Sequence, residues 1–187
     1  MLVRVALAAA LLLPASAFAE LSPYAGQQAR AIKALSDADI EGLLQGRGME
    51  LAKPAELNGY PGPSHSLDLA QDLGLTPEQI AALKPIQQRM AIDAKALGAQ
   101  VVEKERALDR LFADRSINVQ KLQSLNLEIG ELRGRLRTVH LVAHIETVSI
   151  LTPDQIKRYD VLRGYAEPSA ATHEARPASA GRGHGKH

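Results

Sequence analysis

The chain has 187 residues, no cysteine and no tryptophan, and only 3% of its residues are aromatic. The lack of cysteine excludes thiolate chemistry, iron–sulfur clusters and cysteine-type zinc sites, and so few aromatic residues disfavour a large enzyme core or a sugar-binding cleft. With 22 Lys and Arg against 21 Asp and Glu, the chain lacks the net basic charge that a nucleic-acid partner requires.

The first residues have the pattern of a secretory signal. Arg4 supplies a positive charge, residues 5–13 are an unbroken apolar run, and Ala17-Phe18-Ala19 is a small-x-small cleavage site. The apolar run is about half of the roughly 20 residues that span a bilayer. We therefore expect cleavage after Ala19, export to the periplasm, and a mature protein that does not span the membrane.

The segment from residue 20 to 63 is predicted to contain only short elements. Residues 20–35 lack a clear pattern and are expected to be loosely structured. Beyond them, capping and turn residues favour short helices and a connector without regular structure. We predict helices over 36–45, 49–57 and 67–73, and the connector over 58–63.

Two long amphipathic helices are predicted next. The first begins at the N-cap Thr76 and ends near Ala113, with apolar residues on a seven-residue repeat. The second begins near Asn118, and its apolar stripe alternates spacings of three and four residues as far as Ile150. Because a short turn joins them, we expect a long antiparallel hairpin in an all-α fold. A last short helix starts after Thr152.

From Ala166 the sequence is rich in Ala, Pro, Ser, Gly and His, and its apolar periodicity ends. This composition predicts a disordered tail, in which three histidines form at most a low-affinity metal site. The histidines are His173, His184 and His187. We thus divide the chain into a signal peptide (1–19), an N-terminal segment (20–63), a helical domain (64–165) and a tail (166–187).

His140 and His144 lie four residues apart on the second long helix and therefore share a face. Such a pair presents two imidazoles to one metal ion. Val139 and Ala143 occupy the apolar stripe, so we expect the imidazoles at the edge of the hairpin groove or at a dimer contact. The alternative is a pair of surface or interface histidines without a ligand role.

Two further residues are candidate metal ligands. Antiparallel pairing of the long helices brings Met90 near the two histidines, and Glu146 lies close by on the same helix. A thioether suits soft ions such as Cu(I), and a carboxylate adds an oxygen ligand. The candidate ions are Zn, Cu, Ni and Co. Since no catalytic triad, phosphate loop or carboxylate pair has a recognisable spacing, we expect no enzymatic activity and no required cofactor.

Two similar pentapeptides open helices at the two ends of the predicted hairpin. They are Leu75-Thr76-Pro77-Glu78-Gln79 and Leu151-Thr152-Pro153-Asp154-Gln155. In each, the Thr is an N-cap, the Gln completes a capping box, and the Leu is expected to pack under the hairpin end. This capping role explains the residue types without a ligand.

These two motifs, behind a signal peptide, resemble the LTxxQ-motif family of Spy/CpxP-like periplasmic proteins and their heavy-metal-resistance and zinc-resistance-associated relatives. The resemblance covers residues 67–165. It implies a small helical domain that dimerises into a curved cradle and either holds unfolded clients without ATP or binds transition ions for an envelope-stress signalling system. The ligand positions of the metal-sensing relatives correspond to Ala143 and Thr147 here, so their site does not transfer directly.

We therefore expect an ATP-independent chaperone or envelope-stress adaptor, with a heavy-metal sensor or metal-binding resistance protein using His140 and His144 as the alternative. A structural coiled-coil adaptor with neither activity is the third hypothesis. Leu141, Val142 and Val148 lie off the apolar stripe, and a second copy of the chain would cover them. We therefore expect a homodimer.

Overall fold

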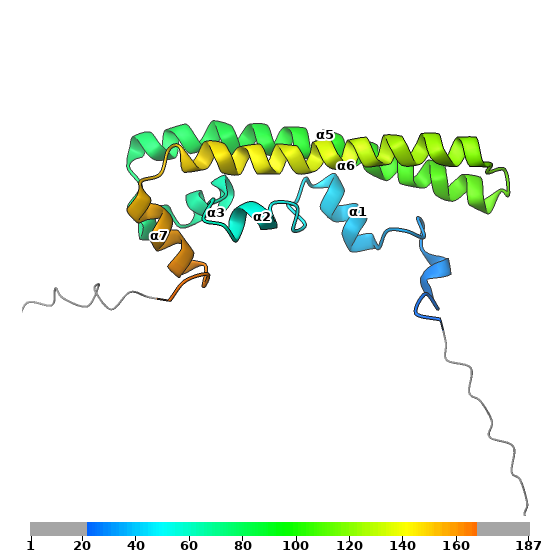
Figure 1. Cartoon of the computed structure of the whole chain (residues 1–187), viewed down its shortest axis with the longest axis horizontal. Coiled ribbons are helices and arrows are strands. Elements are labelled where there is room, and N and C mark those ends of the chain that lie inside the picture. The colour runs from blue at the N-terminus through cyan, green and yellow to red at the C-terminus, as the bar shows by residue number, and fades with distance from the viewer. Residues whose placement is uncertain (1–21, 168–187) are drawn as a thin grey trace, which may run out of the picture.

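The computed structural model describes residues 22–167 (Figure 1). The predicted signal peptide and the three histidines of the predicted tail lie outside this range. The described residues form helices and turns and no β-sheet. The predicted all-α class is therefore confirmed. Within residues 22–167, none of the helices combines the length and the apolar character that crossing a bilayer requires.

Two long helices form the body of the molecule. Helix α5 (Pro77–Ala113) and helix α6 (Val119–Val148) lie side by side and run in opposite directions (Figure 1). Thr76 caps α5 with its side chain and Asn118 caps α6, so both helices begin where the capping residues predict. Ion pairs between the helices, such as Lys104 with Glu128, fix their relative register.

Shorter helices line one side of this pair. They are η1 (Gln27–Ala29), α1 (Asp37–Leu44), α2 (Lys53–Glu56), α3 (Pro63–Asp68), α4 (Ala70–Leu73) and α7 (Pro153–Leu162). In Figure 1 the chain from α1 to α3 runs along the long helices, and α7 lies near α3. The predicted helix over 67–73 is therefore wrong in extent, because Pro63 starts a helix earlier and a break at Leu69 divides α3 from α4.

The prediction that residues 20–35 are loosely structured is wrong for their last part. Ile32 is 0% exposed and Leu35 is 5% exposed, and both belong to one core cluster with residues of α5 and α6. The Asp109 carboxylate accepts hydrogen bonds from the backbone N–H and the ammonium of Lys33. The N-terminal segment is thus packed on the long helices because its two apolar residues fill their groove.

Helix α1 crosses α5 at a glycine. A Cβ atom at Gly98 would lie 2.0 Å from the carbonyl oxygen of Leu43, which is backbone of α1. Only a residue without a side chain permits this approach. Gly98 therefore fixes how closely the N-terminal segment packs, and this contact sets the position of the connector that follows α1.

Candidate functional site

A cavity of about 620 Å³ lies between residues 46–65 and the two long helices. Residues 46–65 include the link predicted over 58–63 and are called the connector from here on. The connector supplies one wall, α5 and α6 supply another, and residues at the end of α7 close one side. Three of its lining residues are histidines: His65 from α3, and His140 and His144 from α6. His65 thus lines the same cavity as the predicted pair, with its Nδ1 3.7 Å from Oε1 of Glu56.

His140 and His144 are buried, with exposures of 3% and 7%, and the predicted place at a groove edge or dimer contact is wrong. The predicted stripe continued through Val139 and Glu146, but the buried face at this end of α6 includes the two histidines and Thr147. An ideal helix drifts by about 20° per heptad relative to a seven-residue repeat. The drift turns both imidazoles inward, and the connector covers them.

The backbone of the connector orients His144. Its Nδ1 lies 2.6 Å from the carbonyl oxygen of Tyr60. Because a carbonyl only accepts hydrogen bonds, Nδ1 carries the proton and Nε2 keeps its lone pair. A Cβ at Gly62 would lie 2.8 Å from Cε1 and 2.9 Å from Nε2 of this ring, so the absence of a side chain at Gly62 lets the connector pack closely on the imidazole.

His140 has an unusual environment. Its Nε2 is buried and has no hydrogen-bond partner among the described residues. Burial lowers the pKa of this imidazole, and the neighbouring His144 lowers it further. His140 is therefore neutral near pH 7. Its buried Nε2 lacks the hydrogen-bond partner that buried polar atoms normally have, within residues 22–167.

Glu56 of α2 connects the remaining polar groups of the cavity. Its Oε1 accepts hydrogen bonds from the hydroxyls of Tyr159 at 2.6 Å and Tyr165 at 3.1 Å, and from Nε of Arg163 at 3.3 Å. Its Oε2 lies 3.7 Å from Nδ1 of His144. Burial and the Glu56 carboxylate raise the pKa of Tyr159, so this hydroxyl stays protonated and donates. No motif in the sequence identified this network, because its members lie more than 100 residues apart.

The other two predicted ligands, Met90 and Glu146, lie in different surroundings. Met90 is half-buried and lines the same cavity as the two histidines. Glu146 lines a separate groove between α5 and α6, where it pairs with Arg89. Met90 also lines the groove of Glu146 and so lies between the two sites, whereas Glu146 does not line the histidine cavity. Across residues 22–167, no three His, Asp or Glu side chains gather in an arrangement that could hold a metal ion.

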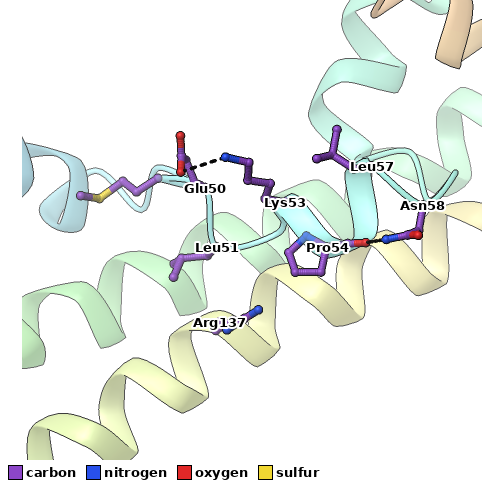
Figure 2. A pocket seen from close by; sticks show the side chains of 8 residues that line it. Glu50, Leu51, Lys53, Pro54, Leu57, Asn58 and Arg137 are labelled. Atoms are coloured by element: carbon purple, nitrogen blue, oxygen red, sulfur yellow. Dashed lines mark hydrogen bonds and ion pairs between the residues drawn. The ribbon is translucent and has the colours of Figure 1, made fainter. Parts of the chain in front are cut away.

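The connector forms a thin wall between two hollows. Figure 2 shows its outer side, a shallow hollow of about 430 Å³ where Glu50 pairs with Lys53 and the Asn58 amide donates to the Pro54 carbonyl. Met49 and Leu57 line both this hollow and the histidine cavity. Met49 and Glu50 both have positive φ angles, of 42° and 64°. Such strain is uncommon outside glycine and is concentrated in the wall of this cavity.

The two pentapeptides are joined to each other at the end of the long helices that lies away from the loop between α5 and α6. Both predicted capping boxes are present. The side-chain amides of Gln79 and Gln155 also donate to each other's oxygens, at 2.8 and 3.0 Å. Each amide additionally donates to a backbone carbonyl beside the other motif, that of Ile150 or Gly74. The glutamines thus join the starts of α5 and α7 as well as capping them.

The leucines of the motifs differ in burial. Leu151 is 7% exposed, and Leu75 is half-buried. Comparison with protein-family models, curated proteins and solved structures finds no match to this chain.

Proposed function

We propose that this protein binds a transition-metal ion at His140 and His144 and acts as a periplasmic metal sensor or metal-binding resistance protein. One observation carries the proposal: Nε2 of His140 is buried beside a cavity without a partner in the described part of the chain. A buried polar atom without a hydrogen-bond partner costs about 1–3 kcal/mol. An ion bound to Nε2 would remove that cost, with the ring proton on Nδ1.

The position of His144 supports the same proposal. Metal-binding histidines commonly donate their second ring N–H to a carbonyl or carboxylate, which fixes the tautomer and the ring orientation. The Nδ1 of His144 makes this bond to Tyr60, with the Glu56 carboxylate behind it. The His144 ring is thus held with its Nε2 on the side away from this bond.

Calorimetric titration of Zn(II), Cu(II), Ni(II) and Co(II) into the full chain tests the proposal. The tail residues His173, His184 and His187 are changed to Ala in every sample, so that they do not contribute heat. The double variant His140→Ala/His144→Ala is expected to abolish tight binding. His65→Ala is the matched control, because this cavity histidine is 46% exposed and lies against Glu56. Unchanged affinity in the double variant would refute the site.

A chaperone or envelope-stress adaptor is the second candidate function. It is favoured by large apolar side chains on the outer sides of the long helices, where Ile92 is 67%, Val142 43% and Ile145 59% exposed. Such side chains bind unfolded clients by removing apolar area from water, at about 25 cal/mol per Å². The test is aggregation of a heat-unfolded client with stoichiometric protein and no ATP. Unchanged aggregation counts against this function.

The same apolar residues support a homodimer. Leu127 is 75% exposed on α6, and Val142 and Ile145 follow it on the outer side of this helix. A two-fold contact between the α6 helices of two copies would cover them and extend the surface available to a client or signalling partner.

The conditions that induce expression distinguish the two candidate functions. Induction of expression by metal favours the sensor, and induction by misfolding stress favours the chaperone.

A further inference from the structure

We infer that the ion for which the cavity is built is a soft monovalent ion, Cu(I), held by the imidazoles of His140 and His144 and the thioether of Met90. This inference rests on the proposed metal-binding function and names the ion class. The first step is the set of donors that reach the cavity. Both histidines offer a nitrogen lone pair, and Met90 of α5 lines the same cavity.

The second step is the position of the oxygen donors. The Oε1 of Glu56 already accepts hydrogen bonds from two tyrosines and Arg163. Its Oε2 lies 3.7 Å from Nδ1 of His144, the protonated side of the ring, opposite the free nitrogen. Glu146 pairs with Arg89 in a separate groove. Within the described residues, the histidine pair therefore lacks the third oxygen or nitrogen ligand that Zn(II), Ni(II) and Co(II) sites use.

The third step is charge. The two imidazoles are neutral ligands, and a thioether is neutral too. The cost of moving an ion out of water rises with the square of its charge, so a divalent ion costs about four times as much as a monovalent one in the same cavity. With three neutral donors and no carboxylate in reach of the free nitrogens, the cavity favours the monovalent ion. Cu(I) also prefers soft sulfur donors and accepts low coordination numbers.

The test uses the full chain with the three tail histidines changed to Ala. Cu(I) is supplied under ascorbate and measured by competition with a chromophoric Cu(I) chelator, and Zn(II) is measured in parallel with a zinc indicator. We expect one Cu(I) per chain and Zn(II) binding that is at least about a hundredfold weaker. Met90→Leu keeps the side-chain volume and is expected to weaken Cu(I) binding at least about tenfold. X-ray absorption of the copper complex is expected to show a sulfur neighbour that this variant removes.

Met49→Leu is the matched control. Met49 lines the same cavity, but its sulfur is directed at α1, where it lies 2.7 Å from the position of a Cβ at Gly42. Its loss is expected to leave Cu(I) affinity unchanged.

The outcomes separate this inference from the proposed function. Zn(II) bound as tightly as Cu(I), with Met90→Leu without effect, overturns the assignment to Cu(I) and leaves the histidine metal site in place. Binding of neither ion, or binding that His140→Gln does not weaken, overturns both. His140→Gln serves here beside the Ala variant because it keeps a polar side chain of similar size. Circular dichroism confirms that each variant is helical.

Discussion

At the scale of single residues, the environment of His140 makes stability depend on pH. Its pKa lies below the ordinary 6.5 because of burial and of His144. Between that lowered pKa and about pH 6.5, the unfolded chain binds a proton at this position and the native chain does not. The free energy of unfolding of the metal-free protein therefore falls as the pH drops below about 6.5, by at most about 1.4 kcal/mol per pH unit.

Urea denaturation at pH 7.5 and pH 5.5 measures this effect. His140→Gln removes the titrating group and is expected to reduce the loss of stability at the lower pH. His65→Gln, at a 46% exposed position of the same cavity, is the matched control. An equal loss of stability in the wild-type protein and in His140→Gln would show that other groups cause it.

Sequence reasoning named part of the proposed site at this scale. The i, i+4 spacing identified His140 and His144, and pairing of the helices identified Met90. Glu56, Tyr60 and Gly62 carry no signal of their own, because their role depends on a connector whose path the local sequence does not determine. The burial of the histidines was also missed, since it comes from helical drift and from a covering segment and not from the heptad pattern alone.

At the scale of elements, Gln79 and Gln155 join two helix starts through one pair of hydrogen-bonded amides. Replacing either by Ala removes a capping-box bond and leaves the other amide without its partner. We expect each single change to cost about 1–2 kcal/mol of unfolding free energy. We expect the double variant to cost less than the sum, with a coupling of about 0.5 kcal/mol or more. Gln88→Ala, on an exposed part of α5, is the control and is expected to change stability little. Fully additive single changes would contradict the joined network.

Gly98 allows a second test at the scale of elements. Gly98→Ala places a methyl group against the Leu43 carbonyl, so α1 has to move away from α5. We expect a loss of about 1–3 kcal/mol in urea denaturation. Gly130→Ala on α6 is the matched control, because a Cβ there meets no atom of the described chain within 4 Å. It is expected to stabilise the helix by up to about 1 kcal/mol. A neutral or stabilising Gly98→Ala would mean that α1 is not packed as closely as described.

Four helices, α1, α5, α6 and α7, could be predicted from the sequence because capping residues mark their starts. Ser36, Thr76, Asn118 and Thr152 all cap the helices that the sequence places after them. The N-terminal segment could not be predicted in the same way. Ile32 and Leu35 belong to a stretch without periodicity, and only the groove of α5 and α6 gives them a buried position.

At the scale of the whole molecule, the exposed apolar side chains of α6 bear on the oligomeric state. We predict that the protein forms a dimer through the outer side of α6, where Leu127 and Ile145 are more than half exposed. Leu127→Glu/Ile145→Glu places charges in that contact and is expected to give a monomer mass by light scattering at micromolar concentration. Ile92→Glu on α5 is the control and is expected to remain dimeric. A monomeric wild-type protein would refute the dimer and remove support for a cradle.

The Glu56 network has a consequence for the order of folding. A short loop joins the long helices, so they can pair early in folding. The hydrogen bond from Tyr165 to Glu56, in contrast, joins residues 109 positions apart in the sequence and forms later. The connector and α7 must both be in place before the cavity exists, and the strained residues Met49 and Glu50 make the connector an early region to open. Metal occupancy would therefore depend on how completely the chain is folded, so that an ion bound at this site reports on the integrity of the protein as well as on the concentration of metal around it.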